Sequence, residues 1–312
     1  MPRFSVVIPA YNAAHTIPDT IRSVLAQTEQ DFELIVVDDG SADETPDLIE
    51  GFAASDPRVS LVRQPNQGTA GARNTGVAHA SAPYVSILDN DDLWMPYYLE
   101  EMGAALDATP DAGFAFCDAW AFDDATSKVH WVTEMHYRPP PPPGADREEV
   151  FLTLAKRNFV LSSATIRRDT LEQAGGFDAG IRGADDYDMW FRLLLTGRTA
   201  VQASSRPLML WRDSPASQSK DELMMTRNLR DVLALVAADP RTPSSARELL
   251  ESRIRGVDRE LAMMAGRNPV PRAAYWLRGS LLAARRALFK DRYWPAEPPP
   301  EVAAAFPRFG RR

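Results

Sequence analysis

The run Ile87-Leu88-Asp89-Asn90-Asp91-Asp92-Leu93-Trp94 places three carboxylates within four residues, directly behind an apolar stretch at 84–88 that is typical of a buried strand. Carboxylates this close repel one another, so a fold that holds them together at a strand end usually has a cation or a bound substrate nearby. An Asp-rich turn or a helix N-cap produces the same local pattern. The choice between these readings depends on the rest of the chain.

Strand-like and helix-like segments alternate around this run. Apolar, β-branched runs predict strands at residues 5–8, 32–37, 59–63, 84–88 and 113–116. Apolar residues spaced three and four apart predict helices at residues 14–27, 45–54, 69–80 and 96–108. Further strand and helix signals follow at 159–166 and 185–195. The alternation predicts an α/β fold with a Rossmann-like, doubly wound, mostly parallel sheet, in which ligands bind beyond the carboxyl ends of the strands.

The pattern becomes almost wholly helical from Asp221, with helices expected at 221–238, 244–265 and 272–292. Five consecutive prolines at 139–143 exclude helix and central strand, and they predict a surface loop near the mouth of the site. We therefore expect an α/β domain at 1–220, a helical C-terminal extension at 221–294 and a loosely ordered tail at 295–312.

Charge is unevenly spread over the 312 residues. The net charge is -8, but residues 267–312 hold ten Lys or Arg against three Asp or Glu, which leaves an acidic body. An acidic body argues against nucleic-acid binding. The single cysteine, Cys117, excludes a disulfide framework, no apolar run is long enough to span a bilayer, and the chain enters a strand too early for a signal peptide. We expect the catalytic part to be cytoplasmic.

Four polar motifs stand at the ends of predicted strands or at a helix start. In Pro9-Ala10-Tyr11-Asn12 an aromatic ring is placed to pack against a nucleobase, and in Asp38-Asp39-Gly40-Ser41 a carboxylate is placed to accept from a base or a ribose hydroxyl. The Gly- and Ala-rich helix start at 66–76, with its cation Arg73, suits a diphosphate or anchors acidic loops. The fourth motif is the run from Asp89 to Asp92. Each is weak alone, whereas four in this order favour a nucleotide site.

On these stretches the chain resembles the inverting, GT-A-fold glycosyltransferases that use nucleotide-sugar donors, often called family two. The matching stretches are Ser5-Val6-Val7-Ile8-Pro9-Ala10-Tyr11-Asn12, Ser23-Val24-Leu25-Ala26-Gln27-Thr28, Val36-Val37-Asp38-Asp39-Gly40-Ser41, Ala72-Arg73-Asn74-Thr75-Gly76, Leu88-Asp89-Asn90-Asp91-Asp92-Leu93-Trp94, Gly175-Gly176-Phe177-Asp178 and Asp185-Asp186-Tyr187-Asp188-Met189-Trp190-Phe191-Arg192-Leu193. Their order makes the resemblance very specific. It implies a GT-A type fold and a nucleotide-sugar-binding catalytic domain at 1–220.

The resemblance implies donor-side roles. The residues implied to bind the donor are Pro9, Ala10, Tyr11, Asp39, Arg73, Asp89 and Asn90. Within this set Asp39 would bond the base, and Arg73 would hold the acidic floor or the diphosphate. Asp91 and Asp89 look like the family's DxD pair, with Asp91 the direct ligand of Mn or Mg and Asp89 near the ribose or the metal. UDP is the family's commonest donor nucleotide, and dTDP and GDP remain open.

Inverting transfer also needs a base that takes the proton of the acceptor hydroxyl. We assign this catalytic role to Asp186, with Asp185 in support where the family more often has Glu. Asp185 is equally suited to cap a helix at 187–195, and Asp92 to cap the helix that follows it. Asp188 and Arg192 lie four residues apart and predict a local ion pair.

The chain departs from the family in one place, because relatives often carry a metal- or diphosphate-binding histidine after the last core strand. The corresponding stretch at 210–219 has none, so Asp213, Ser214 or water would take its place. The four histidines are scattered, and we read them as structural or surface residues. Trp131, near the proline run, is the best candidate for contact with an acceptor sugar.

The predicted helix at 272–292 is amphipathic and basic, with Arg278, Arg285 and Arg292 seven residues apart. Packing on the catalytic domain, contact with an anionic membrane surface and dimerisation are all open to it.

The leading hypothesis is a metal-assisted inverting glycosyltransferase acting on a cell-surface glycan or lipid-linked acceptor, at the inner face of the cytoplasmic membrane. The alternatives are a catalytically impaired nucleotide-sugar or glycan-binding protein and a nucleotidyltransferase, although the latter predicts a Gly-rich first loop that this chain lacks.

Overall fold

The computed structural model describes residues 1–123, 126, 128–131, 140–214, 217, 220–266 and 299–306. The predicted basic helix at 272–292 lies outside the described residues, as do Pro139, His136 and most of the predicted tail.

Within the described residues, seven strands form the larger sheet, in the order β10-β6-β9-β4-β1-β2-β3. Their bounds are β1 Phe4–Ala10, β2 Phe32–Asp38, β3 Val59–Arg63, β4 Tyr84–Ile87, β6 Ala112–Phe116, β9 Ala164–Arg167 and β10 Thr199–Gln202. Strands β1 to β4 are parallel, and β10 is parallel to β6, whereas β9 is antiparallel to both of its neighbours. The α/β class and the mostly parallel sheet are confirmed. The direction of β9 was not predicted, because a short buried strand has the same pattern in either direction.

Strand β1 forms because its seven residues are buried and rich in β-branched side chains, which alternate between two cores on the two faces of the sheet. Each fully buried valine or isoleucine contributes about 1.5–3 kcal/mol. Strands β1 and β2 end level with each other, with Ala10 opposite Asp38, and the Asp39 amide donates to the Ala10 carbonyl at 2.8 Å. The loops that follow the two strands therefore start side by side.

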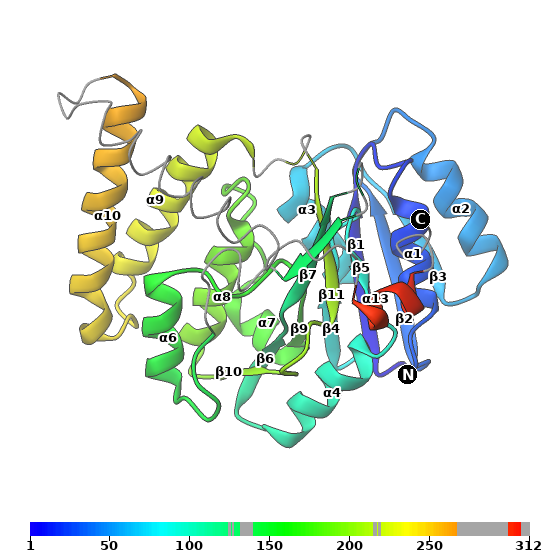
Figure 1. Cartoon of the computed structure of the whole chain (residues 1–312), viewed down its shortest axis with the longest axis horizontal. Helices are drawn as coiled ribbons and strands as arrows, with labels where there is room; N and C mark the ends of the chain where they lie inside the picture. The colour runs from blue at the N-terminus through cyan, green and yellow to red at the C-terminus, as the bar shows by residue number, and fades with distance from the viewer. Residues whose placement is uncertain are drawn as a thin grey trace.

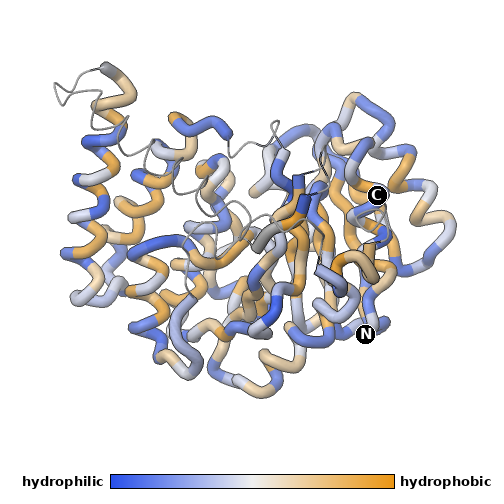
Figure 2. The backbone as a smooth tube through the Cα atoms, viewed as in Figure 1, coloured by the Kyte–Doolittle hydropathy of each residue, from blue (hydrophilic) through white to orange (hydrophobic). Residues whose placement is uncertain are grey.

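Helices cover both faces of this sheet (Figure 1). On one face pack α1 Ile17–Leu25, α2 Thr45–Ser55 and α4 Tyr98–Ala108. On the other pack α3 Gly68–His79, α6 Arg147–Lys156, α7 Arg168–Ala174 and α8 Asp185–Leu195. Figure 2 shows the strands of the large sheet as mostly hydrophobic and the outermost helix as mixed, as expected for a core between two helical layers.

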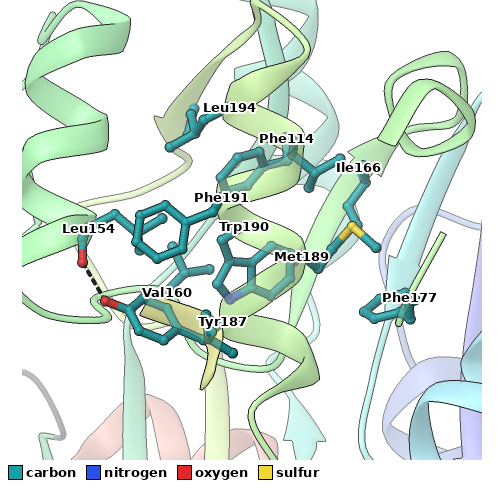
Figure 3. Packing of buried hydrophobic residues seen from close by; sticks show 14 of the residues in the cluster. Phe114, Leu154, Val160, Ile166, Phe177, Tyr187, Met189, Trp190, Phe191 and Leu194 are labelled. Atoms are coloured by element: carbon teal, nitrogen blue, oxygen red, sulfur yellow. Dashed lines mark hydrogen bonds between the residues drawn. The ribbon is translucent and has the colours of Figure 1, made fainter. Parts of the chain in front are cut away.

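Aromatic rings fill the space between α8 and the sheet. Trp190 stacks on Phe114 of β6 with ring centroids 5.5 Å apart (Figure 3). Phe191 packs against Phe151 of α6 with ring centroids 5.2 Å apart. These contacts fix the rotation of α8 about its axis, and so fix the direction in which its first turn points.

The C-terminal helices α9 Glu222–Ala238 and α10 Ser244–Met264 pack on each other and on the outer side of α6 and α8 (Figure 1). Their bounds confirm the helices expected at 221–238 and 244–265. Asp221 caps α9, because its carboxylate accepts from the Met224 amide at 3.0 Å. None of the helices in the described part of the chain is both long and apolar enough to span a membrane.

A smaller sheet was not predicted. In the described residues it has the order β5-β11-β7-β8, with β5 Leu93–Trp94, β7 Ala119–Asp123, β8 Lys128–Trp131 and β11 Met209–Asp213. Leu93, Phe122 and Leu210 from this sheet form a small core with Val302 of α13 Pro300–Ala305. The segment at 299–306 is thus packed against the smaller sheet.

Candidate active site

The carboxyl ends of β1, β2 and β4, the N-terminal half of α3, the first turn of α8 and the end of β11 meet at one edge of the large sheet. All residues predicted to bind the donor, the metal or the acceptor proton come from these segments. The structure therefore brings together residues that lie between positions 9 and 186 of the chain.

The loops after β1 and β2 are joined by Asn12, which has a positive φ of 48°. Asparagine tolerates this left-handed conformation better than most residues. Its amide donates to Ser41 Oγ at 2.9 Å, and its Oδ1 accepts from the Ala42 amide at 2.8 Å. The neighbouring Tyr11 side chain is 50% exposed and free to stack on a flat ligand. These bonds of Asn12 were not predicted from the sequence, although Asn12 ends the first motif.

Asp39 is only 3% exposed, and its two oxygens are already engaged inside the protein. Oδ1 accepts from Gln64 Nε2 at 2.6 Å and from the Gln67 amide at 2.8 Å, while Oδ2 accepts from the Gly68 amide at 2.8 Å. Gly68 has φ +78°, a conformation that favours glycine. Asp39 therefore anchors the start of α3, and its predicted bond to a base remains a prediction.

Asn90 ties the acidic run to the end of β1. Its Nδ2 donates to the Pro9 carbonyl at 2.9 Å, and its own carbonyl accepts from Thr20 Oγ1 at 2.9 Å. Pro9 and Ala10 are buried within β1 and their carbonyls accept from Asn90 and Asp39, so their contact with a donor stays a prediction.

Arg73 lies at the centre of the acidic side of the site and is 3% exposed. Its Nη2 donates to Asp89 Oδ1 and its Nη1 to Asp185 Oδ2, both at 2.6 Å, while its guanidinium lies over the Phe177 ring at 5.3 Å. Burial works to lower the pKa of Arg73, but Asp89 and Asp185 raise it well above the ordinary value. One buried cation thus joins the loop after β4 to the first turn of α8.

Asn74, which has no role in the sequence-based assignment, holds the loop beneath Arg73. Its Oδ1 accepts from the Phe177 amide at 2.7 Å and its Nδ2 donates to the Phe177 carbonyl at 2.8 Å. The only signal for this role was its position next to Arg73.

Asp92 does not cap a helix, contrary to the prediction. Strand β5 follows it, and its Oδ1 accepts from the Arg212 amide at 2.9 Å. Arg212 Nε also donates to the Asp91 carbonyl at 2.8 Å, and its guanidinium lies over the Phe122 ring at 4.8 Å. The turn is therefore held by β11, a strand that is distant in sequence and that sequence periodicity does not pair with it.

Asp91 is half-buried. Burial and the nearby Asp89 raise the pKa of Asp91 to about 6, against an opposing effect of Arg212. No group of three His, Cys, Asp or Glu in the described residues forms a metal cage by itself. Asp213, one of the predicted substitutes for the missing histidine, is paired with Lys220 at 2.5 Å.

Helix α8 begins at Asp185 itself, after Ala184, and has no side-chain cap, so the cap reading of Asp185 is wrong. Its carboxylate faces Arg73 instead. Asp186 Oδ1 accepts from the Tyr187 amide at 2.7 Å, and burial, then repulsion from Asp185, raise the pKa of Asp186 to about 6 while Arg73 works to lower it. The predicted pair of Asp188 and Arg192 is confirmed at 2.6 Å. The side chain of Trp131 lies outside what the structure describes.

Known sequences are similar to this chain over much of its length. Succinoglycan biosynthesis protein ExoO of Rhizobium meliloti is 32% identical over 243 residues, which are 77% of this chain and 67% of that protein. WfgD of Escherichia coli, named a UDP-Glc:alpha-D-GlcNAc-diphosphoundecaprenol beta-1,3-glucosyltransferase, is 44% identical over 97 residues, or 31% of this chain and 38% of that one. An uncharacterized glycosyltransferase of Rickettsia conorii is 28% identical over 61% of this chain, which spans only 30% of that relative's length.

Solved structures show the same fold. TarS 1–349 of S. aureus superposes with a TM-score of 0.64 at 17% identity, covering 85% of this chain and 74% of that one. The mannosyltransferase PcManGT from Pyrobaculum calidifontis superposes with a TM-score of 0.61 at 22% identity, covering 91% and 81%. The predicted GT-A type of the fold is confirmed.

The model of the family described as Glycosyl transferase family 2 matches residues 5–175. The match runs from β1 to the residue after α7, so it contains the loops after β1, β2 and β4 and the whole of α3. Because it covers more than half of the chain, and because a 32% identical relative matches over 243 residues, this chain belongs to glycosyl transferase family 2.

Proposed function

We propose that this chain is an inverting glycosyltransferase, which moves a sugar from a nucleotide-diphosphate donor to an acceptor hydroxyl. The observation that carries the proposal is the Arg73 bridge, which joins the Asp89 loop to the Asp185 turn through two bonds of 2.6 Å. A transferase of this kind needs donor-binding carboxylates and a base at opposite sides of one sugar, and the bridge joins candidates for both.

The donor is proposed to lie along the joined loops after β1 and β2. Tyr11 offers an exposed ring for the base, and Asp39 lies beside it at the end of β2. TarS has been crystallised in complex with UDP and with UDP-GlcNAc, and PcManGT in complex with GDP-Man and Mn²⁺. A uridine diphosphate sugar is our first expectation for this chain.

The carboxylate oxygens around Asp91 are suitable ligands for Mn²⁺ or Mg²⁺. A hard cation prefers carboxylate oxygens, and one or two carboxylates together with substrate phosphates are a common binding set. Burial and Asp89 raise the pKa of Asp91 despite the nearby Arg212, and a bound cation would favour the ionised carboxylate. Asp91 would hold the metal, with Asp89 beside the metal or the ribose. The metal would neutralise the charge that develops on the leaving diphosphate.

The proposed base is Asp186. Its carboxylate takes the acceptor hydroxyl proton while the acceptor oxygen bonds to the anomeric carbon, and the bond from that carbon to the diphosphate oxygen breaks on the opposite side. The nucleoside diphosphate leaves with the bonding electrons, so the configuration at the anomeric carbon inverts. Asp185 supports this turn by holding Arg73 rather than by capping the helix.

The acceptor is proposed to be a growing cell-surface glycan or a lipid-linked intermediate, at the inner face of the cytoplasmic membrane. The names of ExoO and WfgD support these classes. In this proposal residues 1–220 form the catalytic domain, residues 221–294 form the extension, and the basic segment at 272–292 contacts anionic lipid. Failure of the purified protein to bind phosphatidylglycerol vesicles at low salt would contradict the membrane contact.

A thermal-shift panel tests the proposed donor site. The probes are UDP, GDP and dTDP, each with and without Mn²⁺, and we expect UDP to raise Tm more with Mn²⁺ than without it. Asp91→Asn should lose the Mn²⁺ increment and keep the metal-free shift. Asp123→Asn is the matched control, because Asp123 ends a strand of the smaller sheet and bonds the Thr126 amide, so it should keep both shifts.

Turnover separates the enzyme from a binding protein. Nucleotide release from UDP-GlcNAc, UDP-Glc and GDP-Man is measured for the same variants, with water as the acceptor of the sugar. Release from one of these donors supports the transferase. A nucleotide shift without release from any donor would favour the catalytically impaired alternative, and no shift with any nucleotide would contradict the proposed site.

A further inference from the structure

Helices α9 and α10 contact α8 and the loop before it through polar groups as well as apolar ones. We propose that Arg253 of α10 is a positioning residue, which fixes the first turn of α8 through the hydroxyl of Tyr187 and so orients the Asp186 carboxylate. This inference rests on the proposed role of Asp186 as the base.

Arg253 joins three helices through a single nitrogen. Its Nη1 donates to Tyr187 Oη of α8 at 2.9 Å and to the Ala155 carbonyl of α6 at 2.8 Å. The Tyr187 hydroxyl in turn donates to the Leu154 carbonyl of α6 at 2.7 Å, the bond drawn in Figure 3. The hydroxyl is thus used both as donor and as acceptor, which leaves Tyr187 one orientation.

The orientation of Tyr187 sets that of the residue before it. Tyr187 is 4% exposed, and its ring packs against Phe191 with centroids 4.9 Å apart, so the side chain has no room to turn. Its amide donates to Asp186 Oδ1 at 2.7 Å. A shift of the Tyr187 ring would therefore move the backbone to which the Asp186 carboxylate is bonded.

Helix α9 holds the segment just before this turn. The Asn228 side chain donates to the carbonyl of Arg182, in the loop that leads into α8. The two C-terminal helices therefore hold both the loop and the first turn that carry Asp185 and Asp186.

The chemistry of the contact favours positioning over plain packing. Burying part of a guanidinium beside a phenol costs desolvation, and apolar side chains of similar size would stabilise the helix interface at least as well. Directional hydrogen bonds add what apolar contacts lack, because they specify one geometry.

The test uses the full chain with Arg253→Met, Tyr187→Phe and the double variant. Nucleotide release from UDP-GlcNAc, UDP-Glc and GDP-Man gives kcat and KM, and hydrogen exchange follows the amides of residues 187–191. We expect each single variant to lower kcat about tenfold, since small misplacements of a reacting group are costly. The donor KM should stay within about twofold, and exchange of these amides should quicken. The double variant should lower kcat by less than the product of the two single losses, because both single variants remove the shared bond between Arg253 and Tyr187.

Ser245→Ala is the matched control. Ser245 also joins α10 to α6, through a 2.6 Å bond from its Oγ to Glu148, but it does not contact Tyr187. This variant should match the wild type in kcat, KM and exchange. A kcat loss that Ser245→Ala shares would show general loosening of the extension and would overturn the positioning role.

Failure of this inference differs from failure of the proposed function. If Asp186→Asn is inactive while Arg253→Met keeps wild-type kcat and exchange, the positioning role of Arg253 is wrong and the base assignment stands. If Asp186→Asn keeps full turnover, the base assignment is wrong whatever Arg253 does.

Discussion

A single buried guanidinium organises the acidic side of the site. Arg73 bridges Asp89 and Asp185, with Asp91 and Asp186 close by, and Arg212 lies near Asp91 as a second cation. An excess of carboxylates over cations suits a site that binds a metal and a diphosphate, and burial with repulsion from neighbouring carboxylates raises the pKa of Asp91 and of Asp186.

Substitution of Arg73 should separate charge from geometry. Arg73→Met leaves two buried carboxylates without their cation, so we expect a loss of roughly 3 kcal/mol or more of stability. Arg73→Lys keeps the charge but cannot bond both carboxylates in the same fork geometry, so it should fold and lose most of its turnover. Urea unfolding and nucleotide release measure the two effects. Wild-type kcat in Arg73→Lys would show that the bridge has no role in the reaction.

The raised pKa of Asp186 predicts a pH dependence of activity. Asp186 works as a base only when ionised, so kcat should fall as pH drops through about 6. A pH profile of kcat between 4.5 and 8.5 is the measurement, bracketing roughly one to two units around that pKa. A profile flat through pH 6 would contradict the assignment.

The same pKa predicts a pH dependence of stability. The pKa of Asp186 is about 6 in the folded state and near 3.8 in the unfolded state. Stability therefore falls as the pH rises from 3.8 to 6, and the cost of ionising the buried carboxyl is fully present above pH 6. Asp186→Asn removes that cost. With allowance for partial exposure, we expect the free energy of unfolding of Asp186→Asn to exceed that of the wild type by about 1 kcal/mol at pH 8 and to equal it at pH 4. Equal stability at both pH values would show that Asp186 carries no burial cost.

At the scale of elements, α3 matters because it carries Arg73 and packs closely on β1. A Cβ at Gly76 would lie 2.2 Å from Val7 Cγ1, inside the buried centre of β1. Glycine at this position lets the helix approach the sheet, which brings Arg73 within reach of both carboxylates.

Gly76→Ala should therefore destabilise the protein by about 1–3 kcal/mol, because the extra methyl overpacks the core. Gly51→Ala is the control. Gly51 lies inside α2 with nothing within 4 Å of the added Cβ, so alanine there should stabilise by about 0.5–1 kcal/mol. Thermal unfolding of both variants tests the contact, and a neutral Gly76→Ala would mean that α3 can move away from β1.

Sequence periodicity predicted the elements better than their partners. The helices and the strands of the parallel half agree closely with the structure, because each is specified by local spacing and composition. The direction of β9 and the pairing of β5 with β11 were not predicted, because these depend on contacts between residues far apart in the chain. For the same reason Asp92 was predicted to cap a helix, whereas its carboxylate accepts a hydrogen bond from the Arg212 amide.

At the scale of the whole molecule, the chain combines a sheet covered by helices on both faces with a pair of C-terminal helices on one side (Figure 1). The sequence motifs proposed for the donor side each lie in one loop, and the structure places these loops at one edge of the large sheet. The bond from Arg73 to Asp89 agrees with its expected role at the acidic floor, whereas its bond to Asp185 and the Arg253 contact were not predicted, because they join segments far apart in the chain.

The most direct test of the account is the turnover of Asp186→Asn beside its affinity for the donor nucleotide. The account predicts that kcat for nucleotide release falls by about 10²–10⁴, the usual contribution of a general base, while the Kd for the nucleotide with Mn²⁺ is unchanged. Turnover within about twofold of the wild type, at equal nucleotide affinity, would contradict it.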